Sequence, residues 1–224
     1  TLKTTQDQRV PVPMRDGVEL VATVTRPKPE GRYPAILLRT PYGRELSALE
    51  GAWWAARGYA HVAQDVRGRG DSGGAWDPFQ NERHDGYDTI EWLAAQPWCD
   101  GRVGMIGASY LGYVQWQAAV EKPAALRCII PQVSPPHPCL NIPWDHGLFL
   151  LSGNMWWSRI VQGKTTDFSS LGEVPGGQAL ATLPLSKADD AVFGENVPFF
   201  DAWLERDRLE AWSAATLEEV AAVE

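Results

Sequence analysis

The sequence predicts an α/β protein with a mostly parallel sheet covered by helices on both faces. Short apolar segments alternate with helical segments from residue 35 to residue 130, the pattern of consecutive strand–helix–strand units. Residues 35–38 are all apolar, as expected for a strand buried on both faces. Ser109 stands between the apolar run 103–106 and a helical segment that begins at Tyr110. The serine is therefore expected at a strand-to-helix turn.

The elements are expected in a definite order along the chain. Residues 9–13 and 18–25 alternate apolar and polar side chains around Asp16-Gly17, which indicates a β-hairpin. Further strands are expected at 35–38, 59–64, 103–106 and 126–130. The strand over 126–130 is expected to be buried, like the one over 35–38. Helices are expected at 49–57, 82–95 and 110–120, which Gly58, Pro97 and Pro123 bring to an end.

The pattern changes after Ser134. Four prolines between residues 135 and 143 interrupt it, since proline cannot continue a strand or helix interior. An aromatic-rich helix is expected over 144–161 and another over 198–212. Between them, residues 163–186 form a loop-rich segment with Pro175-Gly-Gly177 at its middle, and residues 213–224 are a weakly amphipathic tail.

Composition limits the possible functions. The 224 residues carry a net charge of −8 without a basic block, which argues against nucleic acid or an anionic membrane as the main partner. The three cysteines are an odd number without a Cys-x-x-Cys pair, so neither a disulfide framework nor a zinc site is indicated. No apolar run reaches membrane-spanning length. These features lead us to expect a cytoplasmic protein without a metal or cofactor.

Ser109 has the surroundings of a nucleophile elbow. The segment Gly107-Ala-Ser109-Tyr-Leu111-Gly112 places small residues on both sides of the serine, as such a sharp turn requires. The second glycine comes one place later than in Gly-x-Ser-x-Gly, and Leu111 occupies the usual position. Taken alone, the segment also fits a serine that caps a helix.

The flanking segments resemble those of a known family. They are Arg39-Thr-Pro-Tyr42-Gly, Asp65-Val-Arg-Gly68-Arg-Gly70-Asp-Ser-Gly-Gly74, Asp85-Gly-Tyr-Asp88-Thr-Ile-Glu-Trp-Leu and Gln96-Pro-Trp98-Cys-Asp-Gly101. Together with the elbow, these segments resemble those of the X-Pro dipeptidyl-peptidase and cocaine-esterase-like family of serine hydrolases. They follow one another in the family's order over residues 8–134. The resemblance implies the first part of an α/β-hydrolase domain over 1–134, a helical cap over 135–213, and a tail over 214–224 that leads to further strands.

The resemblance also assigns roles to site residues. It implies that Ser109 is the nucleophile of an acyl-enzyme mechanism and that the Tyr42 hydroxyl stabilises the oxyanion. The backbone N–H of Tyr110, the residue after the nucleophile, is the second expected donor. The alternative for Tyr42 is a loop tyrosine packed under the cap.

One loop also fits a different motif. Gly68-Arg-Gly70-Asp-Ser-Gly73 matches the dinucleotide pattern Gly-x-Gly-x-x-Gly. Asp71 inside the loop and Trp76-Asp77-Pro78 after it disfavour a phosphate site. In the resembled family this loop is structural, and Arg67 and Arg69 are expected to pair with carboxylates.

The base and its orienting carboxylate have no candidates at the family's positions. His61 is expected to be structural and His84 a solvated or capping residue, while His137 and His146 stand at the entrance to the cap. Asp145 is not expected to orient His146, because neighbouring side chains on a helix point apart. We therefore expect a second polypeptide to supply the later strands with the Asp or Glu and the His.

Three functions remain open at this point. The first is a serine hydrolase that cleaves an ester or amide of a small-molecule or peptide acyl substrate. The second is an inactive hydrolase-like protein that serves as a binding module or scaffold. The third is an acyltransferase, which would use the same residues.

Overall fold

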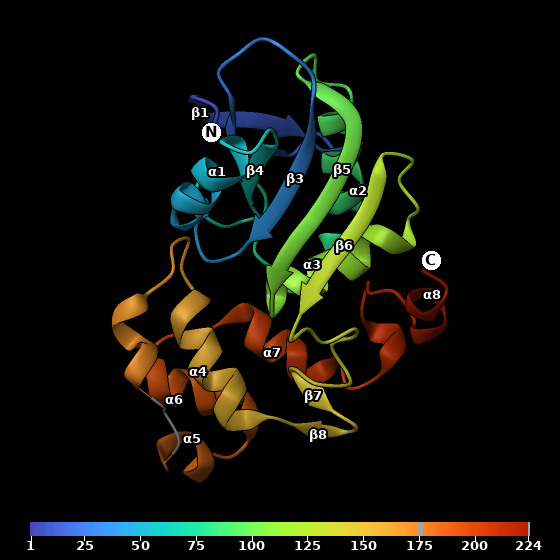
Figure 1. Cartoon of the computed structure of the whole chain (residues 1–224). Coiled ribbons are helices and arrows are strands. Elements are labelled where there is room, and N and C mark those ends of the chain that lie inside the picture. Colours follow the sequence, from blue (N-terminus) through green and yellow to red (C-terminus); the bar gives the residue numbers. More distant parts are fainter. Residues whose placement is uncertain (174–176, 224) are drawn as a thin grey trace.

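A six-stranded sheet forms the centre of the computed structural model, which describes residues 1–173 and 177–223 (Figure 1). Its strands are β1 (Thr4–Pro13), β2 (Glu19–Pro27), β3 (Tyr33–Thr40), β4 (Ala60–Asp65), β5 (Cys99–Ala108) and β6 (Leu126–Gln132). They lie in the order β1-β2-β4-β3-β5-β6. β4, β3, β5 and β6 run parallel, and the β1–β2 hairpin joins β4 antiparallel. The predicted hairpin and parallel sheet are both confirmed.

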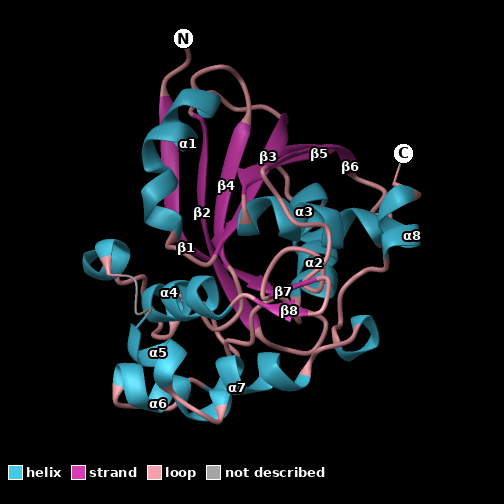
Figure 2. Cartoon of the chain, turned by 90° about the horizontal axis from the view of Figure 1, so that it is seen from below, coloured by secondary structure: helices cyan, strands magenta, loops and turns pink. Residues whose placement is uncertain are grey.

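Helices cover the two faces of this sheet (Figure 2). A 3₁₀ turn, η1 (Arg44–Ser47), leads into α1 (Ala48–Ala55), which packs on β2 and β4. On the other face α2 (Glu82–Ala94) and α3 (Tyr110–Val120) pack on each other and on β5. The central strands are buried along their length because both faces are covered: every residue of β4 is buried, including His61, Gln64 and Asp65.

The prediction that the last strand is buried is wrong. β6 is the edge of the sheet, and Cys128 and Ile130 on it are exposed. Val133, directly after the strand, is 93% exposed. The segment is apolar enough to be a central strand, but no strand among the described residues pairs with its free edge.

The cap region lies beyond the carboxyl ends of the parallel strands (Figure 1). It begins with a small hairpin, β7 (Trp144–Asp145) and β8 (Leu148–Phe149), followed by α4 (Leu151–Val161). After η2 (Phe168–Gly172) come α5 (Gly177–Ala181), η3 (Leu185–Lys187), α6 (Ala188–Phe193), α7 (Pro198–Glu205) and η4 (Leu209–Ala211). The tail beyond the cap contains α8 (Leu217–Ala221), which packs on α3. Pro175 and Gly176 of the expected loop centre fall outside the described residues.

Two helices are shorter than predicted. The helix expected over 144–161 begins only at Leu151, because His146 and Gly147 take positive φ values of 49° and 87° and turn the chain into the hairpin. The helix expected over 198–212 ends at Glu205. Beyond it, Trp212 is buried and its indole N–H donates to the Arg206 carbonyl, so burial of the aromatic ring takes precedence over helix continuation.

Aromatic side chains join the cap to α3. Phe79 packs against Tyr110 and Tyr113 on α3 and against Trp157 on α4, at centroid distances of 4.9–6.0 Å. Trp203 on α7 stacks on Trp157 at 5.7 Å. These rings contribute large buried apolar areas, so Trp157 and Trp203 stabilise the contact between the cap and α3. No helix in the described part of the chain is long and apolar enough to cross a bilayer.

Candidate active site

The turn between β5 and α3 holds Ser109 in a strained conformation. Ser109 has φ 58° and ψ −123°, a combination that costs a non-glycine residue of order 1–3 kcal/mol. Its N–H donates to the Gln132 carbonyl at 2.9 Å, and its carbonyl accepts from the amides of Gly112 and Tyr113. The side chain is exposed. This conformation and exposure are those of a nucleophile elbow, and a helix-capping contact by the Ser109 side chain is not among those formed by the described residues.

Close packing explains both glycines of the elbow. A Cβ at Gly107, where φ is 136°, would lie 2.5 Å from the Cβ of Leu111. A Cβ at Gly112 would lie 2.5 Å from the Cβ of Ser134, in the segment after β6. The second glycine is therefore needed at 112, where α3 passes the chain after β6, and position 111 can carry a leucine.

A glutamine that the sequence did not reveal braces the turn. Gln115 is fully buried on α3, and its amide nitrogen donates to the carbonyls of Gly107 and Leu111. Its side-chain oxygen accepts from the Ile130 amide at 2.8 Å. Gln115 therefore ties the end of β5, the first turn of α3 and β6 together.

Tyr42 lies on the loop after β3, and its hydroxyl faces the elbow. The hydroxyl oxygen accepts a hydrogen bond from the Trp157 indole at 3.0 Å. Burial raises the pKa of the phenol, and the neighbouring Trp157 indole and Ser109 side chain only partly oppose that rise. Tyr42 therefore keeps its proton at neutral pH and can donate it in a hydrogen bond.

Tyr110 is anchored by its side chain. Its hydroxyl donates to Glu82 Oε1 at 2.8 Å and accepts from the Phe79 amide at 3.0 Å. Burial raises the pKa of this phenol well above its usual range. Tyr110 is also the first residue of α3, and amides of a first helical turn have no partner within the helix. Its N–H is thus positioned next to the Ser109 hydroxyl group and available to an oxyanion.

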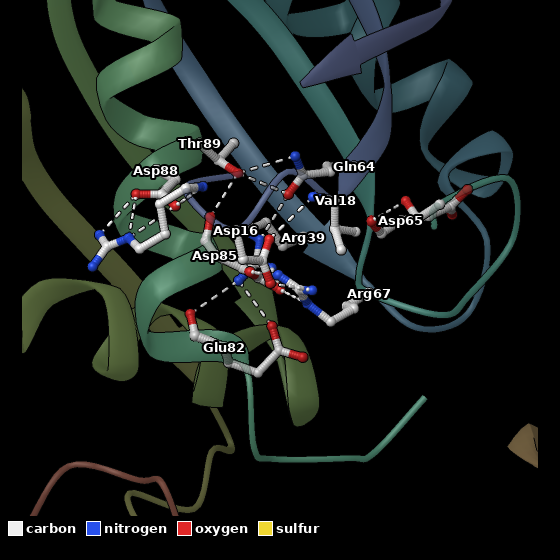
Figure 3. Close-up of polar contacts among 12 residues, drawn as sticks. Asp16, Val18, Arg39, Gln64, Asp65, Arg67, Glu82, Asp85, Asp88 and Thr89 are labelled. Carbon is white, nitrogen blue, oxygen red and sulfur yellow. Dashed lines mark hydrogen bonds and ion pairs between the residues drawn. The ribbon is translucent and has the colours of Figure 1, made fainter. Parts of the chain in front are cut away.

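Buried charges fix α2 against the sheet behind these residues (Figure 3). Arg39 on β3 is fully buried and lies 2.8 Å from Glu82 and 4.0 Å from Asp85. Its Nε donates to Gln64 on β4 at 2.8 Å. Burial raises the pKa of Glu82, while the Arg39 guanidinium favours its charged form. The network holds the start of α2, and through Glu82 it holds Tyr110.

The glycine-rich loop after β4 is structural, as predicted. A Cβ at Gly68 would lie 2.3 Å from the Trp76 amide nitrogen, and one at Gly70 would lie 2.2 Å from Asp65 Oδ2. Arg67 pairs with Asp85 at 2.6 Å and with Asp16 at 2.8 Å, as expected. The same prediction for Arg69 is wrong. Its guanidinium is buried and donates to two backbone carbonyls and one hydroxyl instead.

None of the four histidines hydrogen-bonds Ser109 among the contacts of the described residues. His61 is buried in β4, where burial lowers its pKa to about 4, and His84 is exposed on α2. His137 is buried and accepts from the Cys139 amide. The prediction that Asp145 and His146 point apart is wrong, because they lie in a turn and their side chains approach to 2.6 Å. Within the described ranges no group of His, Cys, Asp and Glu could hold a metal ion, and the three cysteines are free.

The parallel sheet and the serine elbow at the end of its fifth strand define the α/β-hydrolase fold. The comparisons with known proteins agree. The chain belongs to the X-Pro dipeptidyl-peptidase (S15) family, whose model matches residues 16–222. It is 33% identical to the cocaine esterase of Rhodococcus sp. (strain MB1 Bresler) over 93% of this chain. The predicted family and fold are thereby confirmed.

Solved structures show the same fold. A CocE/NonD family hydrolase from Staphylococcus aureus is 26% identical, with a TM-score of 0.64 over 87% of this chain and 39% of that one. An α-amino acid ester hydrolase is 22% identical, with a TM-score of 0.74 over 95% of this chain and 40% of that one. The chain likewise spans 40% of the length of the Rhodococcus esterase.

Proposed function

We propose that this chain carries the nucleophile and the oxyanion site of a serine hydrolase that cleaves esters or amides through an acyl-enzyme. The observation that carries the proposal is the strained, exposed Ser109 facing the Tyr42 hydroxyl. In this mechanism the Ser109 oxygen attacks the acyl carbonyl, and the negative charge that develops on the carbonyl oxygen is stabilised by Tyr42 and by the Tyr110 amide. The family membership and the similarity to the Rhodococcus esterase support an esterase.

The base and the orienting carboxylate come, in this proposal, from polypeptide outside these 224 residues. In the α/β-hydrolase fold they follow the nucleophile in the chain, in the order Ser, Asp or Glu, His. The open edge of β6 is where additional strands would extend the sheet. A hollow of about 370 Å³ beside it is lined by the end of α3, β6 and residues 222–223. Strand addition at this edge would therefore bury the exposed apolar groups there.

An acyltransferase remains the second candidate, because transfer to an alcohol or amine requires the same nucleophile and oxyanion donors. The two reactions differ only in what attacks the acyl-enzyme. Product analysis with and without an added alcohol distinguishes them. Water as the only acceptor supports the hydrolase.

Replacing Ser109 by alanine tests the proposal directly. Ester turnover by the active enzyme should fall by several orders of magnitude in Ser109→Ala, because the acyl-enzyme can no longer form at this position. Ser213→Ala is the matched control, since Ser213 is also exposed and its side chain lies outside the site. Turnover by Ser109→Ala at the parent rate would refute the proposal. A wild-type enzyme that turns over no ester or amide would favour the inactive scaffold.

A further inference from the structure

Arg69 stands out in the glycine-rich loop because its buried charge has no carboxylate partner. The guanidinium is fully buried, and no described carboxylate lies within ion-pair distance of it. Burying an unpaired cation costs several kcal/mol, whereas Arg67, two residues earlier, is balanced by Asp85 and Asp16. Burial lowers the pKa of Arg69 to about 10, so the group stays charged at neutral pH. The guanidinium is instead stabilised by three neutral hydrogen-bond acceptors and by the Trp76 ring, whose centroid lies 5.4 Å away.

The hydrogen bonds of Arg69 join two parts of the chain that meet at the active site. Its Nε donates to the carbonyl of Pro41, the residue before Tyr42, at 2.8 Å. Its Nη1 donates to the carbonyl of Val161, at the end of the cap helix α4, at 2.7 Å. The Arg69 side chain thereby links the Tyr42 loop to the cap.

Thr166, in the cap, hydrogen-bonds both Arg69 and the Tyr42 loop. Its hydroxyl accepts from Arg69 Nη2 at 3.2 Å and donates to the Tyr42 carbonyl at 3.0 Å. The Trp157 indole, also on the cap, donates to the Tyr42 hydroxyl. The backbone and the hydroxyl of Tyr42 are therefore both held by the cap, and Arg69 and Thr166 hold the backbone.

We propose that Arg69, together with Thr166, is a positioning residue that fixes the Tyr42 hydroxyl at the oxyanion position and couples it to the cap. The proposal rests on the proposed function of Tyr42. Arg69 acts through Tyr42 and makes no contact with the reacting atoms. Any displacement of the α4 end would move Pro41 and Tyr42 with it, and misplacing a catalytic group by about 1 Å can cost about a hundredfold in rate.

A double-mutant cycle in the active enzyme tests this coupling. Arg69→Met should lower kcat about tenfold or more with a smaller change in KM, because the oxyanion contact forms only in the transition state. Thr166→Val, a change at a half-buried position, should also lower kcat. The kcat of Arg69→Lys should lie between those of Arg69→Met and the parent enzyme. In the Tyr42→Phe background, Arg69→Met and Thr166→Val should have no further effect on kcat. A full additional loss in that background would overturn the proposal. Thr165→Val, at the exposed neighbouring position, is the matched control.

The Trp157 indole gives a readout that does not depend on turnover. In the ¹⁵N-tryptophan-labelled chain, Thr166→Val and Arg69→Met should shift the Trp157 Nε1–H resonance toward its position in Tyr42→Phe. The indoles of Trp144 and Trp212, which donate to the Trp203 and Arg206 carbonyls, should keep their resonances. An unchanged Trp157 resonance in both variants would overturn the coupling. If the resonance shifts but Tyr42→Phe keeps the parent kcat, the coupling stands and the catalytic role of Tyr42 fails.

Discussion

At the scale of single residues, the chemistry depends on a few positions that local sequence can specify only in part. Ser109 must accept φ 58° because β5 ends and α3 begins on either side of it, and the glycines at 107 and 112 remove the side chains that would clash. The requirement at Gly107 is local, because a Cβ there would meet Leu111, whereas the requirement at Gly112 comes from Ser134 in the segment after β6. The partner of the Tyr42 hydroxyl, Trp157, is 115 positions away, and no local pattern indicates that contact.

Removing one hydroxyl tests the oxyanion role of Tyr42. Tyr42→Phe should lower kcat about a hundredfold with little change in KM, because the lost hydrogen bond stabilises the charge that develops in the transition state. Steady-state ester hydrolysis measures both constants. Tyr33→Phe removes a hydroxyl that donates to the Pro29 carbonyl at the surface, and its kcat should equal that of the parent. Full activity of Tyr42→Phe would leave Tyr42 with only a packing role.

At the scale of elements, alternation of apolar segments predicted the sheet well and the cap poorly. Strands 35–38 and 103–106 were recognisable because central parallel strands are apolar on both faces. In the cap, the same aromatic residues could lie on a helix or in a loop, and tertiary packing decided between them. Gly147 turns 144–149 into a hairpin, and Trp212 is buried after α7 has ended. Arg69 was assigned the wrong partners for the same reason, since Val161 and Thr166 are more than 90 positions away.

The buried charge network should dominate the attachment of α2 to the sheet. Arg39→Met leaves Glu82 buried without its cation, while Asp85 keeps its pair with Arg67. The substitution should lower the free energy of unfolding by about 3–5 kcal/mol. Urea unfolding measures the change. Arg102→Met, which breaks a surface pair with Asp100, should cost less than about 1 kcal/mol. Equal effects of the two substitutions would contradict the assignment of the network.

His61 should make stability depend on pH in a predictable direction. Burial lowers its pKa from 6.5 to about 4, so between these values the unfolded chain binds a proton that the folded chain does not. The free energy of unfolding therefore falls as pH falls from 6.5 toward 4, by at most about 3 kcal/mol from this group. His61→Leu should flatten that part of the profile in urea unfolding. A profile unchanged by His61→Leu would show that other groups cause the dependence.

At the scale of the whole molecule, the open edge of β6 is the feature that the fold leaves unexplained. Val133 is 93% exposed at φ 43°, an unfavourable conformation for a β-branched residue. Ile130 on the strand is 48% exposed. Exposed apolar strand edges promote pairing with another segment. From the order of elements we expected later strands supplied by a second polypeptide. The strand itself was expected to be buried, because its apolar residues do not reveal which segment covers them.

Substitution at this edge tests the proposed added strands. Val133→Lys should weaken association with the completing polypeptide, and with it ester turnover, because it places a charge in an apolar interface. Leu49→Lys, at an 88% exposed position on α1, is the matched control and should leave both unchanged. Size-exclusion chromatography with intact-mass analysis follows the association. A 24.7 kDa chain that hydrolyses esters as a monomer would contradict the proposed second polypeptide.

The central claim is that Ser109 is the nucleophile, and covalent labelling tests it most directly. A fluorophosphonate added to the active enzyme should form one adduct, which peptide mass spectrometry should locate on Ser109 and which should be absent from Ser109→Ala. An enzyme that hydrolyses esters while the adduct forms at another residue, or while Ser109 stays unlabelled, would contradict the account.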